Sequence, residues 1–142
     1  MKKKIFIASL LVIVITSFIR SQCREFTDTA AIPKMEDYIL TGRYHSFLMK
    51  EGDEVLIFKT LNRNIKYKFV IAKEQSLQTN IHFVIKDWSN NILFDNSLYN
   101  YSLDWEYFSD RPQKVKIYID VPKIHSNPSS GCVSLLIGMK KI

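Results

Sequence analysis

The segment from Lys114 to Val121 alternates between two kinds of residue at every step. Valine or isoleucine occupies each odd-numbered position, whereas lysine, tyrosine or aspartate occupies each even-numbered one. Because successive side chains of a strand point to opposite faces, this period of two predicts a strand that is buried on one face and exposed on the other. Pro122 predicts its end, since proline has no amide hydrogen for a ladder.

The same signal recurs along most of the chain. Residues 66–71 and 81–86 also alternate, and residues 131–139 place four apolar side chains on one face. Further strands are predicted at residues 43–49, 54–61, 92–94 and 103–108. No stretch beyond the first 22 residues keeps the apolar period of a helix. About seven or eight short strands with turns between them predict an all-β fold, an antiparallel two-sheet sandwich like a jelly roll.

Two turns predict hairpins within this sandwich. Residues 88–91 follow the strand at 81–86 and contain two asparagines, which tolerate left-handed backbone at a turn. Gly52 supplies a positive φ between residues 43–49 and 54–61. These two strands are therefore expected to pair as a second hairpin.

The first 22 residues predict a signal peptide. Three lysines follow Met1, and an uncharged run from Ile5 to Ile19 comes next. About fifteen residues suit the apolar core of a signal peptide better than a membrane span of about twenty. An uncleaved N-terminal anchor is the alternative. Residues 23–35 are polar and predict a flexible lead-in, so the sandwich domain is expected over residues 36–142.

The net charge of +6 comes largely from this leader. The chain has 20 lysines and arginines against 14 acidic residues, and four of the basic ones flank the apolar run: Lys2, Lys3, Lys4 and Arg20. Without them the balance is 16 minus 14, or +2. A nucleic-acid partner is not expected from so small a charge. Export to the periplasm, the outer-membrane surface or the medium is expected instead.

The two cysteines leave three roles open. A chain with two cysteines in an oxidising compartment often pairs them, which predicts a disulfide between Cys23 and Cys132. The second role is lipidation of Cys23, although Gln22 and Arg20 stand where a lipoprotein signal has a small and an aliphatic residue. In the third role Cys132 is a small buried apolar residue.

Several features follow one another in an order that resembles a known type of domain. They are Gly52-Asp53-Glu54 before a strand, the hairpin from Asp87 to Asn96, Trp105, the strand ending at Val121-Pro122, and the segment from Gly131 to Gly138. This order resembles short secreted bacterial β-sandwich proteins and, through them, the jelly-roll domain of the pre-peptidase C-terminal type. Asn90 or Asn91 stands where that type has glycine. The resemblance spans about residues 41–139 and implies an export-associated, non-enzymatic domain.

Catalytic motifs are absent from the sequence. The three histidines lack metal-binding spacing, and there is no G-x-S-x-G motif. Asp104 and Glu106 are two residues apart on a predicted strand, which places them on one face about 7 Å apart. Paired carboxylates at such separations serve glycoside hydrolysis. A small secreted glycoside hydrolase is therefore the alternative function, and no cofactor is expected.

Two groups of residues remain as binding candidates. Asp87, Asn91 and Asp95 place oxygen atoms around a hairpin, where either calcium binding or ordinary turn chemistry explains them. Exposed aromatic residues beside polar ones suit a sugar ring, although the same aromatic residues also fill cores. The aromatic candidates are Trp88, Tyr99, Tyr101 and Trp105. The sequence thus favours a structural or binding role, with an envelope protein or glycan as partner, through one sheet face or the loop at 97–104. Membrane contact is expected only through the leader or a lipid on Cys23.

Overall fold

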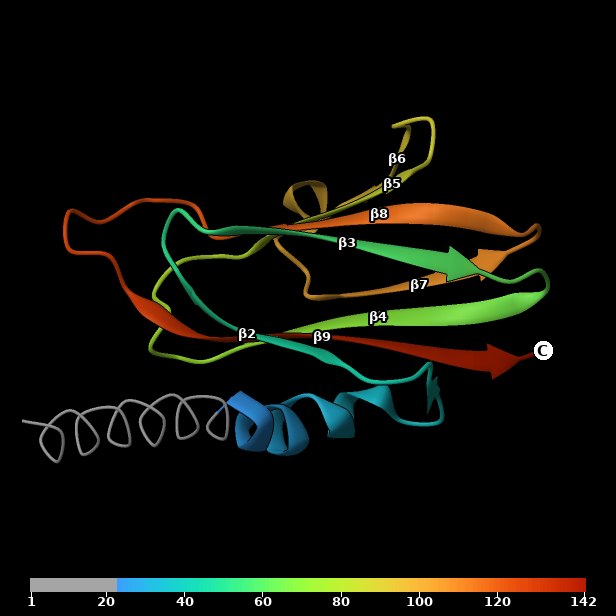
Figure 1. Cartoon of the computed structure of the whole chain (residues 1–142), viewed down its shortest axis with the longest axis horizontal. Helices are drawn as coiled ribbons and strands as arrows, with labels where there is room; N and C mark the ends of the chain where they lie inside the picture. Colours follow the sequence, from blue (N-terminus) through green and yellow to red (C-terminus); the bar gives the residue numbers. More distant parts are fainter. Residues whose placement is uncertain (1–22) are drawn as a thin grey trace, which may run out of the picture.

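A computed structural model describes residues 23–142 (Figure 1). The predicted signal peptide lies outside these residues. The described chain begins with an α-helix at residues 23–30. The elements that follow are η1 (Ile32–Met35), β1 (Ile39–Leu40), β2 (His45–Lys50), β3 (Glu54–Leu61), β4 (Ile65–Lys73), β5 (His82–Asp87), β6 (Ile92–Asp95), η2 (Asn96–Tyr99), β7 (Asp104–Ser109), β8 (Gln113–Asp120) and β9 (Ser130–Lys141).

The strands form two antiparallel sheets packed face to face (Figure 1). One sheet has the order β1-β9-β4-β7, and β2 pairs with the same edge of β9 as β1 does. The other sheet has the order β3-β8-β5-β6. This confirms the predicted all-β, two-sheet sandwich, and every predicted strand is present. The two-residue β1 is the one strand of residues 23–142 that the sequence pattern did not predict.

The core between the sheets is built from the predicted inward faces. Tyr67, Phe69 and Ile71 of β4 are fully buried, opposite Ile117 and Ile119 of β8. The hairpin of β5 and β6 is also confirmed, with a register shift between Ile85 and Lys86.

The second predicted hairpin is wrong. β2 pairs with β9 and β3 pairs with β8, so the turn at Gly52 carries the chain from one sheet to the other. Gly52 does adopt the positive φ, at 95°. In a hairpin the apolar sides of both strands would share one face. The crossing instead lets Met49 and Ile57 approach the core from opposite sheets, where both are buried.

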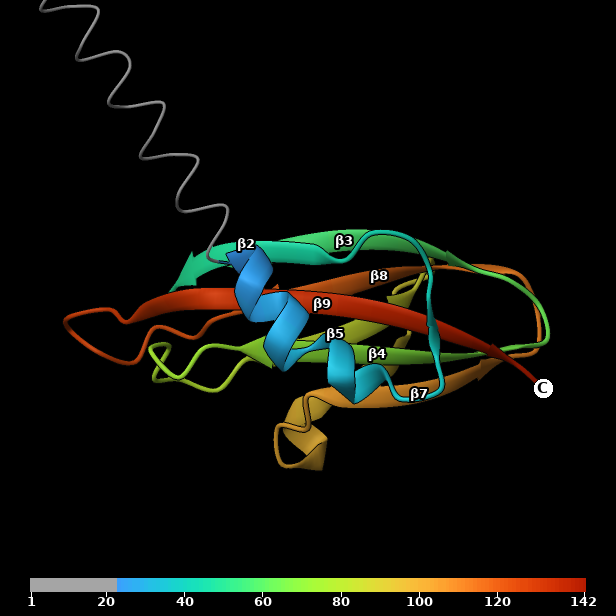
Figure 2. The same cartoon turned by 90° about the horizontal axis from the view of Figure 1, so that it is seen from below.

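The predicted flexible lead-in at residues 23–35 is also corrected. These residues form the α-helix and η1, which cross the outer face of the five-stranded sheet (Figure 2). They cover Val70, Ala72 and Leu136, which leaves β4 and β9 buried on both faces. A polar segment gave no helical signal because tertiary packing, rather than helix propensity, stabilises it.

A covalent bond and a group of hydroxyls hold this helix in place. Cys23 forms a disulfide with Cys132 of β9, with the two Cα atoms 5.3 Å apart. Beside it, the hydroxyl of Thr27 contacts those of Ser46 and Ser134 beneath the helix. The disulfide role of Cys23 is thus confirmed. A lipid thioether on Cys23 is incompatible with it, because both need the same sulfur atom.

Gly138 of β9 allows the close approach of the segment after the helix. A Cβ atom there would lie 2.3 Å from Cε of Met35 and 2.8 Å from Cβ of Tyr38. Any other residue at this position would push the segment away from the sheet.

Candidate functional site

The two outer faces of the sandwich differ. The helix and η1 cover the central strands β4 and β9 of the five-stranded sheet, whereas no such layer within residues 23–142 covers the four-stranded sheet, whose outer side carries exposed apolar side chains. We define this open face as the outward side chains of β3, β8, β5 and β6 together with Trp88. Four of its large apolar side chains are exposed: Leu56 at 45%, and Phe58, Trp88 and Ile92 at 58% each.

Strand register arranges the open face in rows. Leu56, Tyr118 and Val84 stand opposite one another across β3, β8 and β5. The next row consists of Phe58, Lys116 and Lys86, and beyond it Thr60 stands opposite Lys114. Apolar and basic side chains therefore share one end of the face.

Trp88 and Phe58 form an aromatic corner at this basic end. Their ring centroids lie 6.0 Å apart and the ring planes are inclined by 57°. The corner bounds a hollow of about 310 Å³, which Thr60 and Lys114 also line. This volume is near the lower end of the range of about 300–1,000 Å³ for small-molecule sites.

Three lysines surround the corner without acidic partners. The ammonium groups of Lys116 and Lys114 lie 5.0 and 5.7 Å from the ring centroid of Trp88, and that of Lys86 lies 5.0 Å from Tyr118. Lys116 donates a hydrogen bond to Oδ1 of Asn90. Among residues 23–142, no carboxylate forms an ion pair with any of the three lysines. Their charges are available to an anion.

The other end of the open face is acidic. The ring nitrogens of His82 lie 3.1 Å from an oxygen of Asp95 and 2.9 Å from one of Asp120. Glu54 stands opposite Asp120. Burial works to raise the pKa of Asp95, but hydrogen bonds from Ser97 and His82 outweigh it, and the net pKa is lowered. The face is therefore positive at one end and negative at the other.

The structure does not bring the four predicted aromatic residues together. Trp88 follows β5, whereas Tyr99 ends η2 at the opposite end of the β5–β6 hairpin. Tyr99 stacks on Phe94, which stacks on Trp105, with centroid distances of 5.4 and 5.1 Å. Trp105 is half-buried in this stack at the margin of the core. Tyr99 and Tyr101 are exposed, at 62% and 40%.

Asn96 holds the loop that carries Tyr99 and Tyr101, a structural role that sequence reasoning missed. Its fully buried side chain accepts a hydrogen bond from the amide of Phe83 and donates to the carbonyl oxygens of Ile81 and Ser102. An asparagine after a strand looks like an ordinary turn residue, so the sequence offered no signal of this role.

The structure brings two of the three calcium candidates together, Asp87 and Asn91, but not Asp95. Asp87 accepts hydrogen bonds from the amide and the side chain of Asn91, which closes the β5–β6 turn. These bonds, with that from the Asn91 side chain first, outweigh burial and lower the pKa of Asp87. Asp95 lies at the far end of β6 beside His82. Within residues 23–142, no three side chains of histidine, cysteine, aspartate or glutamate gather as metal ligands.

Asp104 and Glu106 lie exposed on β7 at the edge of the five-stranded sheet. Glu106 forms an ion pair with Lys66, and this contact holds the pKa of Glu106 below its ordinary value. A general acid in glycoside hydrolysis needs the opposite shift. A hollow beside Asp104 is lined by Glu36 and Lys68 among others, but not by Glu106.

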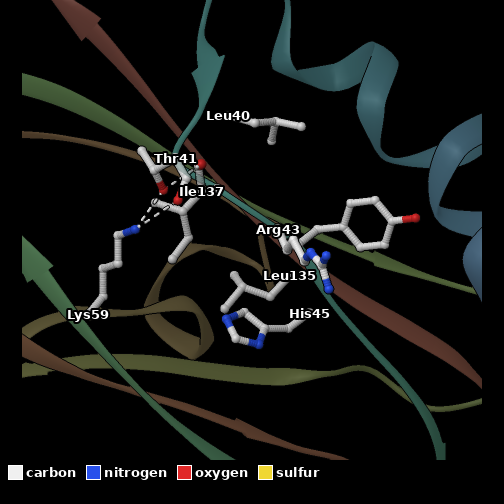
Figure 3. A pocket seen from close by; sticks show the side chains of 9 residues that line it. Leu40, Thr41, Arg43, His45, Lys59, Leu135 and Ile137 are labelled. Carbon is white, nitrogen blue, oxygen red and sulfur yellow. Dashed lines mark hydrogen bonds between the residues drawn. The ribbon is translucent and has the colours of Figure 1, made fainter.

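A smaller pocket opens between the β1–β2 loop and β3 (Figure 3). The ammonium group of Lys59 donates there to the carbonyl and hydroxyl oxygens of Thr41 (Figure 3). Burial lowers the pKa of both Lys59 and the neighbouring His45. The pocket has a volume of about 20 Å³, which leaves room for about one water molecule.

Glu51 is a second residue that sequence reasoning missed. Its side chain is fully buried, and its two oxygens accept hydrogen bonds from the amides of Ile124, His125 and Ser129 and from the side chains of His125 and Ser129. It therefore fixes the loop between β8 and β9. A glutamate in a predicted turn gives no sign of burial.

No family model matches the chain, and no curated protein matches it. No helix within residues 23–142 has both the length and the apolar character to cross a membrane.

Proposed function

We propose that the protein is an exported, non-catalytic binding module and that the open face contacts its ligand. The observation that carries this proposal is the exposed aromatic corner of Phe58 and Trp88 among three lysines that form no ion pair within residues 23–142. Contiguous exposed apolar surface costs solubility, so where it persists on a soluble domain it commonly marks an interaction site.

The contrast between the two sheets supports this choice of surface. At the centre of the five-stranded sheet, the outer apolar residues Val70, Ala72 and Leu136 are covered by the helix that the disulfide anchors, whereas Leu48 and Phe108 on its edge strands β2 and β7 stay exposed. The four-stranded sheet has comparable residues, such as Leu56 and Ile92, yet nothing in residues 23–142 covers them. A ligand that binds there would remove them from water.

Two observations support export. The leader pattern at the start of the sequence is that of a signal peptide. The disulfide agrees with it, since such bonds persist in oxidising compartments and are rare in the cytosol. The resemblance to secreted β-sandwich domains points in the same direction.

Trp88→Ala should weaken binding of the oxidised protein to the envelope fraction of its source cells by about 10-fold or more, because a central aromatic anchor commonly contributes 2 kcal/mol or more. Co-sedimentation of labelled protein with this fraction measures the affinity. Since the Trp88 side chain is exposed, the variant should keep the melting temperature of the wild type.

Ile124→Ala is the matched control. Ile124 is 66% exposed and lies in the loop between β8 and β9, away from the aromatic corner. Its replacement should leave the affinity unchanged. Equal affinity of Trp88→Ala and wild type would rule out the open face as the binding surface.

A further inference from the structure

We propose that the ligand of the open face is an acidic polysaccharide, whose sugar rings pack in the aromatic corner while its carboxylate or sulfate groups pair with Lys86, Lys114 and Lys116. This inference rests on the proposed function and specifies its ligand.

The aromatic corner has the shape and chemistry that a sugar ring requires. Phe58 and Trp88 offer two apolar surfaces at an angle, and the hollow between them holds a group the size of a small ring. The hydroxyl of Thr60 lines the same hollow, and the amide of Asn90 lies within hydrogen-bond distance of Lys116. Apolar plates with a few polar groups nearby are typical of small-molecule sites.

The lysines indicate that the ligand is acidic. Lys86 and Lys116 are direct cross-strand partners on the outward side of β5 and β8. Side chains in such positions have Cβ atoms about 5 Å apart, and like charges there destabilise a sheet. In the part of the chain that the structure describes, no carboxylate forms an ion pair with either lysine to offset this repulsion. An anionic group between the two ammonium groups would turn it into attraction.

The acidic end of the same face argues against an anionic membrane. A bilayer is flat and would meet the whole face, so Glu54, Asp95 and Asp120 would approach the lipid phosphates and be repelled. A linear polymer can lie along the basic rows alone. Acidic peptide motifs are typically recognised by clusters of arginines, and extended peptides add to a free sheet edge, whereas the basic groups here are lysines on the face of a sheet.

The test is a titration of the full-length oxidised protein with polygalacturonate and, separately, with chondroitin sulfate. Tryptophan fluorescence reports the binding. Both should bind. Raising NaCl from 50 to 500 mM should weaken binding by about 10-fold or more, because the Debye length falls to about 4 Å. The affinity of the double variant Lys114→Gln, Lys116→Gln should be lower than that of the wild type by a similar factor. It should also depend much less on the salt concentration.

Lys123→Gln is the control, since this exposed lysine lies beyond the end of β8, and it should bind as the wild type does. Neutral dextran, polyglutamate and phosphatidylglycerol vesicles serve as competing ligand classes. Binding to any of them as strong as to the acidic polysaccharides, or no binding to either polysaccharide, would overturn the inference.

The two proposals fail in different ways. If envelope binding depends on Trp88 but neither polysaccharide competes with it, the acidic polysaccharide is wrong and the binding face stands. If envelope binding does not depend on Trp88, the binding face itself is wrong.

Discussion

Replacing both cysteines, as Cys23→Ser with Cys132→Ser, should lower the free energy of unfolding by about 4 kcal/mol, the chain-entropy contribution of a closed loop of this length. The two cysteines are 109 residues apart. In a domain of this size such a loss lowers the melting temperature by about 10 °C or more. Thermal unfolding followed by circular dichroism, with the wild type oxidised, measures the difference.

The loss should be greatest in the N-terminal helix. Without the disulfide, residues 23–30 keep their packing on Val70, Ala72 and Leu136 and a few hydrogen bonds, namely the hydroxyl contacts of Thr27 and those that Tyr44 and Ser46 donate to Asp28 and to the carbonyl of Cys23. Amide exchange should therefore rise in residues 23–35 more than in β4 or β8. The wild type treated with reductant serves as control and should match the double variant. Equal melting temperatures for the oxidised wild type and the variant would contradict this account of the helix.

Glu51→Gln is expected to have the second-largest effect, a fall in melting temperature of about 5 °C or more at pH 7. The amides of Ile124, His125 and Ser129 and two side chains of the same loop donate to the Glu51 carboxylate, so an amide NH₂ group in its place would face donors and leave some without acceptors. Differential scanning calorimetry of the two proteins measures the shift. Glu54→Gln is the control, because the Glu54 side chain is exposed.

The effect of Glu51 should also depend on pH. Hydrogen bonds, led by that from the His125 amide, hold the pKa of Glu51 far below its ordinary value of 4.5. A carboxyl whose pKa is lowered by folding stabilises the fold above its unfolded pKa and loses this contribution as pH falls through the folded one. The difference in melting temperature between wild type and Glu51→Gln should therefore be largest at pH 7 and shrink steadily below pH 4.5. A gap that grows toward low pH would contradict the assigned hydrogen bonds.

Most strands were predictable because one face of each packs in the core between the sheets, although β4 and β9 are covered on their other face as well. Alternation alone located β4, β5, β8 and β9, and Pro122 marked the end of β8. Which strands pair with one another was harder to predict, because the turn at Gly52 fits a hairpin as well as a crossing between the two sheets. The helix at residues 23–30 gave no periodic signal, because its stability comes from a disulfide and from contacts with β9.

The candidate site was predictable only in part. Trp88 was identified, and the structure places it on an exposed surface as a ligand platform requires. Its neighbours Phe58 and Lys116 are 30 and 28 residues away in the sequence, so only strand register reveals that they share a corner. Tyr99 and Trp105, which lie near Trp88 in sequence, instead belong to the stack around Phe94.

The most direct test of the binding face is hydroxyl-radical footprinting of the oxidised protein with and without its envelope fraction. Trp88 and Phe58 are exposed in the free protein and react with the radical, as do Tyr99 and Tyr101, which serve as internal references. We predict that the envelope fraction protects Trp88 and Phe58 and leaves both tyrosines as reactive as before. Protection of Tyr99 and Tyr101 with no change at Trp88 would contradict the account and place the binding surface at the η2 loop.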